Sequence, residues 1–171
     1  KKEATSKNAK YELERYVFFF DRYMNHEKAK KLSIGMRDTI QKEIQCFSGI
    51  KNLPYEELKF MEEAVETIIK ARRTLKNTYI FGYYMKDVNQ RQLFEHNQYL
   101  LESNADRLHE MMENETKKKL LDINIYDEFT KEWTLFKANV TNLSSATLKY
   151  LENLLIEIEN NMMDLVELKN N

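Results

Sequence analysis

The side chains with the clearest chemical potential are carboxylates on the segment Arg91 to Glu113. Glu95, Glu102 and Asp106 are separated by seven and four residues. On a helix of 3.6 residues per turn these steps keep all three within a narrow arc, with Gln98 between them. Such a line can accept charge-assisted hydrogen bonds from a partner, or it can be a solvated helix face. The residues alone leave both interpretations open.

Other kinds of chemistry find little support in the sequence. A di-iron bundle needs Glu-x-x-His on two helices, and only Asp106-x-x-His109 comes near that motif. The single cysteine, Cys46, is predicted to be a small core side chain rather than a nucleophile. Three scattered glycines provide no phosphate loop. We therefore predict no catalytic residue and no metal site, and we expect the histidines to be surface or capping residues: His26, His96 and His109.

The composition favours helices and limits the partners. The chain has three glycines and one proline in 171 residues, which is typical of long helices with short connections. Its 27 basic and 28 acidic side chains give no electrostatic case for nucleic acid. No apolar run approaches the roughly 20 residues of a membrane span. The chain begins Lys-Lys without a visible signal peptide, so we expect a fragment of a larger intracellular protein.

Turn-forming residues divide the chain into its expected elements. We predict one all-α domain over residues 1–171, with residues 1–8 as a frayed tail. Gly35 marks a junction after the first helix, and Pro54 is placed at the first position of a later one. Ser144 and Ser145 either interrupt the last helical stretch or lie within it. The result is an elongated antiparallel bundle of five or six helices, over residues 9–30, 36–47, 54–86, 91–113 and from 126 onward, with a turn at 87–90.

Apolar spacing predicts which faces of these helices are buried. The first helix carries Leu13, Tyr16, Val17, Phe20 and Met24, and further aromatic residues widen that face, so we expect it to be core. Gly82, within an aromatic stretch, suggests the close approach of another helix. Two more stripes are predicted to be buried. One lies on the acidic helix, at Leu93, Leu100, Leu101, Leu108, Met111 and Met112; the other is a C-terminal seam at Leu148, Leu151, Leu155, Ile158, Met162 and Leu165.

Three segments together resemble the Ariadne domain, the helical C-terminal module of Ariadne-type RING-between-RING ubiquitin ligases. They are YELERYVFFFDRYMNH (Tyr11–His26), ARRTLKNTYIFGYYMK (Ala71–Lys86) and LFEHNQYLLESNADRLHE (Leu93–Glu110). Their order and spacing fit as well. The similarity is clearest over Tyr11 to Glu113, whereas the last helices match only in length and helical character.

The resemblance implies a regulatory role. Such ligases pass ubiquitin from a conjugating enzyme to a catalytic cysteine in a RING-like domain and then to substrate. The Ariadne domain packs on that RING-like domain and covers the cysteine, and a neddylated cullin-RING ligase releases it. The implied partners are therefore the protein's own RING-between-RING module and a cullin-RING ligase.

The resemblance also assigns residues to the inhibitory contact. Glu95 and Asp106 match acidic contact positions of the family, and Glu102 lies between them on the same line. At the junction after the first helix the family has an aromatic residue followed by an acid, where this chain has Leu32 and Ser33. The hydrophobic character is partly kept there, and the charge is lost.

The fragment itself has none of the cysteine-rich RING sequence. We expect it to hold no cofactor and to transfer no ubiquitin, while the full-length protein is expected to be a cytoplasmic or nuclear E3 ubiquitin transferase with zinc in its RING domains. The alternative function is a helical protein-interaction scaffold with no role in ubiquitin transfer.

Overall fold

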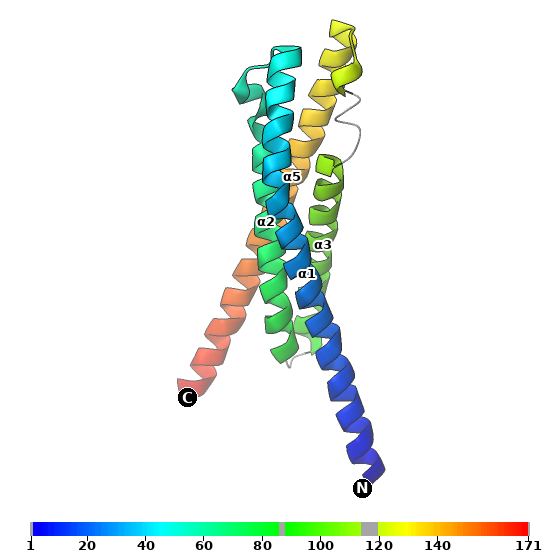
Figure 1. Cartoon of the computed structure of the whole chain (residues 1–171). Helices are drawn as coiled ribbons and strands as arrows, with labels where there is room; N and C mark the ends of the chain where they lie inside the picture. Colours follow the sequence, from blue (N-terminus) through cyan, green and yellow to red (C-terminus); the bar gives the residue numbers. More distant parts are fainter. Residues whose placement is uncertain (1, 86–87, 114–119, 171) are drawn as a thin grey trace.

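The computed structural model describes residues 2–85, 88–113 and 120–170. It confirms an elongated, antiparallel, all-α bundle (Figure 1). Helix α2 is central, because it contacts each of the other three long helices. The N-terminal part of α1 and the C-terminal part of α5 project from the same end of the bundle and diverge (Figure 1). The long helices are α1 (Lys2–Lys51), α2 (Tyr55–Tyr84), α3 (Val88–Glu113) and α5 (Tyr126–Asn170).

The turn between α1 and α2 is formed by residues suited to it. Asn52 has a φ of 53°, the left-handed conformation that commonly ends a helix and that Asn tolerates well. Pro54 is extended, with φ −68° and ψ 152°, and its carbonyl accepts a hydrogen bond from the Glu57 amide at 2.9 Å. Pro54 therefore precedes the helix rather than occupying its first position. Lys51 donates to the Ile123 carbonyl at 2.6 Å, which ties the turn to the start of α5.

The predicted junction in the first helix is wrong, because α1 continues through Gly35 to Lys51. A glycine inside a helix costs only about 1 kcal/mol relative to alanine. Buried side chains on either side of it offset that cost, namely Ser33, Met36 and Ile40. Helix α1 also begins at Lys2, so it includes residues 2–8 that the sequence predicts as a tail. Similarly, α3 begins at Val88, inside the predicted turn at 87–90. Helix α5 is continuous through Ser144, which is buried.

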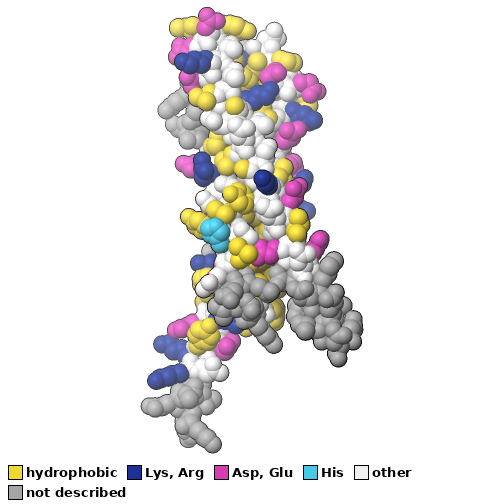
Figure 2. All heavy atoms as spheres, turned by 180° about the vertical axis from the view of Figure 1, so that it is seen from behind, with side chains coloured by type: hydrophobic (Ala, Val, Ile, Leu, Met, Phe, Trp, Pro, Cys, Tyr) yellow, Lys and Arg dark blue, Asp and Glu magenta, His cyan; other side chains and the backbone are white. Residues whose placement is uncertain are grey.

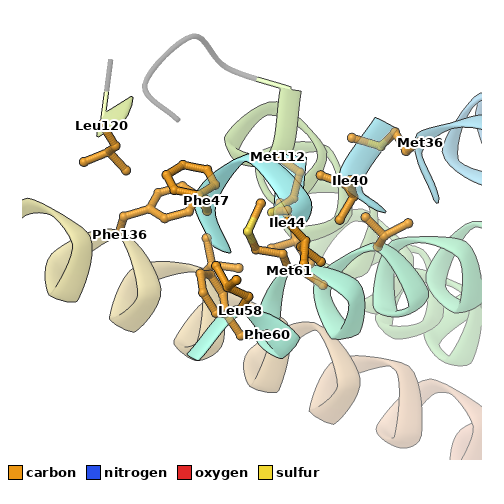
Figure 3. Close-up of a cluster of buried hydrophobic side chains, with 14 of the residues drawn as sticks. Met36, Ile40, Ile44, Phe47, Leu58, Phe60, Met61, Met112, Leu120 and Phe136 are labelled. Atoms are coloured by element: carbon orange, nitrogen blue, oxygen red, sulfur yellow. The ribbon is translucent and has the colours of Figure 1, made fainter. Parts of the chain in front are cut away.

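One hydrophobic cluster lies in the half of the bundle that contains the α1–α2 turn (Figure 3). It joins α1, α2, α3 and α5, and Trp133 contacts the rings of Phe47, Phe60, Phe129 and Phe136. We call this half the turn half. A second cluster lies in the half that contains the α2–α3 connection, which we call the arm half. Its buried residues are Ala71, Leu75, Met85, Phe94, Leu101, Ala105, Leu151 and Leu154.

The predicted core face at the start of α1 is wrong. Phe20 is 46% exposed, and Leu13, Tyr16 and Val17 are also exposed. Phe19 is the buried ring of that region, because the face of α1 that turns toward α2 and α3 is the one that also carries His26 and Ser33. The aromatic groups of α1 therefore form surface as well as core.

The other buried stripes are confirmed only in part. On α3, Leu101, Leu108 and Met112 are buried, whereas Leu93 is exposed and Phe94 is buried in its place. On α5, Leu151 is buried together with Leu154, whereas Leu155 and Met162 are exposed. The side chain of Leu165 lies outside the described residues.

The prediction for Gly82 is confirmed. A Cβ placed there would lie 3.2 Å from the Phe19 ring and 3.5 Å from the Phe94 ring. In this part of the bundle α1, α2 and α3 meet at van der Waals distance, and a glycine makes that approach possible. No helix in the described part of the chain is both long enough and apolar enough to cross a membrane.

Candidate protein-binding site

Glu95, near the start of α3, faces outward. Its side chain is 47% exposed, and its carboxylate lies 3.8 Å from Nε of Arg91, one turn earlier on α3. An exposed pair of this kind is worth at most about 0.5 kcal/mol, because water and salt screen it. Glu95 is therefore free to exchange its arginine for a group on a partner.

Glu102 faces inward and joins three helices. Its carboxylate lies 3.4 Å from His26 Nε2 on α1 and accepts a hydrogen bond of 3.1 Å from the Tyr79 hydroxyl on α2. The contact with His26 holds the pKa of Glu102 below its usual range, against the opposing effect of burial. Burial, together with the neighbouring Glu102 charge, raises the pKa of Tyr79. This carboxylate is already engaged, so its role in the described domain is to hold helices together.

The prediction that His26 is a surface or capping residue is wrong. His26 is buried, and its ring stacks on Tyr79 with 5.3 Å between the ring centroids. It is thus neither a surface nor a capping residue. His109 lies 3.1 Å from Glu113, and the other expected surface histidine, His96, is exposed.

Asp106 also has a partner within the domain, but much of its side chain remains exposed to solvent. Its Oδ1 accepts a hydrogen bond from Nη2 of Arg72 on α2. The two side chains differ greatly in exposure, with 6% for Arg72 and 60% for Asp106. The pair therefore has a buried cation and an exposed anion, which leaves part of the carboxylate available to a partner.

The remaining predicted site residues behave differently from each other. Leu32 is 69% exposed, so it offers an apolar side chain to a partner. Ser33 is fully buried, and its hydroxyl donates to the Ala29 carbonyl at 2.8 Å within α1. Gln98, which the helical spacing places on the acidic line, is buried and donates to Thr78 at 2.9 Å. The line thus divides into outward residues, Glu95 and Asp106, and inward residues, Glu102 and Gln98.

Sequence reasoning missed the basic and aromatic residues that engage the acids. Arg72, His26 and Tyr79 come from α1 and α2, and no spacing rule within α3 can identify them. A weak signal existed in the apolar surroundings of Arg72, because the pattern on α2 places it beside the buried Ile68 and Leu75.

A second charged cluster also links α1 to α2. The Glu27 carboxylate accepts hydrogen bonds from Lys30 at 2.8 Å and Lys76 at 2.9 Å. These two ammonium groups lower the pKa of Glu27 to about 2. A third cation, Lys31, lies 3.9 Å from the same carboxylate. The cluster is structural, because Glu27 is already paired within the domain.

The surface also contains an apolar groove between α1 and α2 in the arm half. It has a volume of about 240 Å³ and is lined by tyrosine and phenylalanine rings with Ile80. Figure 2 shows hydrophobic side chains beside charged ones along the projecting N-terminal part of α1. The groove is a second feature suited to binding protein.

The described residues show no group of three or more His, Cys, Asp or Glu side chains that could hold a metal ion. Cys46 is exposed, so its predicted place in the core is wrong. It lies on the outer face of α1, next to the buried Phe47.

An all-α bundle with outward carboxylates, an exposed leucine and an apolar groove has the features of a protein-binding module. The comparison with known families specifies which one: the family model described as Ariadne domain matches residues 14–171. This chain belongs to the Ariadne domain family.

Several relatives are named as ubiquitin ligases. The chain is 34% identical over 162 residues to the putative E3 ubiquitin-protein ligase ARI6 of Arabidopsis thaliana, covering 91% of this chain and 28% of the relative. It is 34% identical over 122 residues to the E3 ubiquitin-protein ligase dbl4 of Schizosaccharomyces pombe, covering 67% and 24%. It is 35% identical over 112 residues to the E3 ubiquitin-protein ligase ariadne-1 of Drosophila melanogaster, covering 65% of this chain and 22% of the relative. The chain therefore spans less than a third of the length of these relatives.

Proposed function

We propose that this domain restrains an E3 ubiquitin ligase from within the same polypeptide, by packing on the catalytic RING-like domain and covering its cysteine. The family membership and the ligase names of the relatives support the ubiquitin role. The catalytic domain, with its zinc, belongs to the part of such a ligase outside this chain.

The observation that carries the proposal is the pair of outward carboxylates on α3. Glu95 and Asp106 match the inhibitory positions of the family, and both remain exposed although each has an arginine neighbour. Leu32 adds an exposed apolar group at the third position. Ser33 is buried and contributes no polar atom to this surface, so the proposed contact rests on Glu95, Asp106 and Leu32.

Release by a neddylated cullin-RING ligase completes the proposal. Its support is the family resemblance, since such a partner must compete with the catalytic domain for the Ariadne domain or shift their equilibrium. A ligand shifts that equilibrium only by its difference in affinity for the closed and open forms.

The test uses the full-length ligase with Glu95→Gln and Asp106→Asn combined. The measurement is the rate at which the catalytic cysteine reacts with a ubiquitin-based thiol probe, without any cullin present. We expect faster reaction, because two contacts that hold the closed form are weakened. Glu110→Gln is the matched control, since Glu110 is an exposed carboxylate on the same helix. Unchanged reactivity of the double variant would contradict the proposal, whatever the change in the melting temperature of the domain.

A protein-interaction scaffold is the second candidate, and the apolar groove between α1 and α2 favours it. It predicts that removing the whole domain leaves the cysteine's reactivity with the probe unchanged. The inhibitory function predicts that this deletion increases it. The two candidates are therefore separated by one truncated enzyme.

A further inference from the structure

In the ion pair between α2 and α3 the cation, Arg72, is buried and the anion, Asp106, is exposed, and this difference affects the inhibitory contact. Arg72 is buried, its Nη2 donates to Oδ1 of Asp106, and its Nε has no hydrogen-bond partner within the described residues. A buried guanidinium that loses its carboxylate is left as an uncompensated charge, which is strongly unfavourable. Asp106 therefore cannot leave Arg72 in order to bind a partner.

Asp106 can nevertheless hold two groups at once. A carboxylate has two oxygens and can accept about four hydrogen bonds. One oxygen points to Arg72, and the side chain as a whole is 60% exposed. Because an aspartate has only two side-chain torsions, fixing Oδ1 on the guanidinium also fixes the direction in which Oδ2 faces solvent.

The charges around Asp106 also restrict what it suits. Arg72 offsets most of the carboxylate's charge, so a partner's lysine or arginine gains little there. The hydrogen bond of a neutral donor, such as a backbone N–H, hydroxyl or amide, depends less on the net charge of the carboxylate. It is favoured by an acceptor oxygen held in a fixed direction. At Glu95 the arginine neighbour is exposed and 3.8 Å away, so that carboxylate remains suited to a cation.

We propose that Arg72 is a positioning residue for the inhibitory contact: it holds Asp106 so that its second oxygen accepts a hydrogen bond from a neutral donor of the catalytic RING-like domain. Arg72 itself does not touch the partner. This inference rests on the proposed function, since it assigns a partner chemistry and a supporting residue to the same site.

The first test compares Asp106→Asn, Arg72→Met and the double variant in the full-length ligase, by reaction of the catalytic cysteine with the ubiquitin-based thiol probe. We expect each single variant to increase the rate by about tenfold, as for one interfacial hydrogen bond lost. The double variant should be no faster than the faster single variant, because both changes remove the same bond.

The control must separate positioning from loss of stability. Ile44→Ala removes a buried side chain from the turn half, away from the acidic line, and lowers the melting temperature of the domain. We expect it to leave the cysteine's reactivity unchanged. If Arg72→Met increases reactivity no more than Ile44→Ala at a matched loss of melting temperature, Arg72 is only structural and the inference is overturned.

Arg72→Lys provides a second variant if Arg72→Met does not fold. Lysine keeps the charge but not the planar guanidinium whose Nη2 donates to Oδ1 of Asp106. Positioning predicts a rate between those of the parent and Asp106→Asn, whereas a purely electrostatic role predicts the parent rate. The parent rate for Arg72→Lys therefore contradicts the inference.

Salt concentration tests the nature of the partner group. With a neutral donor, the ratio of rates between Asp106→Asn and the parent should change less than twofold between 50 and 500 mM NaCl. The corresponding ratio for Glu95→Gln should fall, because salt screens an exposed ion pair. A steep fall for Asp106→Asn would show a cationic partner and overturn that part of the inference.

The failures remain distinguishable. If Asp106→Asn increases reactivity more than Ile44→Ala at a matched loss of melting temperature and Arg72→Met does not, the positioning role fails and the proposed function stands. If Asp106→Asn has no effect, both fail at this residue, and the truncated enzyme decides whether the domain inhibits at all.

Discussion

The two halves of the bundle are built from similar residues but are closed to different degrees. In the turn half, rings from α1, α2 and α5 surround Trp133, and most members of the cluster are almost fully buried. In the arm half, the most aromatic part of α1 packs through Phe19, while Tyr16, Phe20 and Tyr84 remain exposed. The helices diverge there, and α1 and α5 project past the bundle (Figure 1).

The difference shows that aromatic content does not measure burial. The turn half is closed by a third and fourth helix over the α1–α2 pair. The start of α1 packs mainly on α2, and an apolar groove lies beside it. Polar side chains connect helices in both halves, but those of the turn half are exposed pairs such as Arg37–Glu66 and Lys137–Glu57. In the arm half they are more buried: Glu102 contacts His26 and Tyr79, and Glu27 is bonded by Lys76. Function that depends on exposed groups is therefore expected in the arm half and along α3.

The largest expected effect comes from breaking the closed half. Trp133→Ala should lower the free energy of unfolding by about 3–5 kcal/mol, because the ring is buried among four others. Phe20→Ala should cost only about 1 kcal/mol, because about half of that ring is already in water. Urea unfolding of the domain measures both. Equal losses would mean that the start of α1 is covered in solution.

The polar connections of the arm half should give an intermediate effect. Tyr79→Phe keeps the ring and removes the hydroxyl that donates to Glu102. We expect a loss of about 1–2 kcal/mol, as for a hydrogen bond to a charged group that is partly buried. Tyr83→Phe is a matched control on the same helix. A loss no larger than that of the control would show that the Glu102 contact adds nothing to stability.

Two glycines distinguish open from crowded positions on the helices. Gly35→Ala should stabilise the domain by about 0.5–1 kcal/mol, because an added Cβ meets nothing within 4 Å and alanine favours helix. Gly82→Ala should stabilise less or destabilise, because its Cβ would meet the Phe19 ring at 3.2 Å. The difference in melting temperature between the two variants checks this. An equal gain at both positions would show that Phe19 moves aside freely.

The smallest effect is a change in the slope of stability with pH. The pKa of Glu27 is lowered to about 2 by Lys30 and Lys76, from an ordinary value near 4.5. The unfolded chain therefore binds a proton more readily than the folded domain, so this contribution is complete above about pH 4.5 and is lost as pH falls toward 2. Urea midpoints between pH 5 and 2.5 should fall less for Glu27→Gln than for the parent. Parallel curves would contradict the assignment.

The sequence predicted elements better than faces. Asn52 and Pro54 mark a real turn, and Gly82 marks a real close approach. The acidic line on α3 is not one face, because Glu95 and Asp106 are exposed whereas Glu102 contacts His26 and Gln98 is buried. The junction at Gly35 was wrong because one glycine costs less than the packing on either side provides. The face of Leu13, Val17 and Phe20 was placed inside because both sides of α1 are apolar at that point, and periodicity cannot rank two apolar faces.

The sequence by itself determined that the chain is helical, where its main turn lies and which family it belongs to, because these follow from local propensity and from ordered segments of side chains. The tertiary structure alone decided which acids face a partner. Glu102 is taken by His26 and Tyr79, and Asp106 is held by Arg72 yet exposed. The physical reason is that helical spacing fixes directions only around one axis, whereas burial and charge pairing depend on which neighbouring helix lies along each direction.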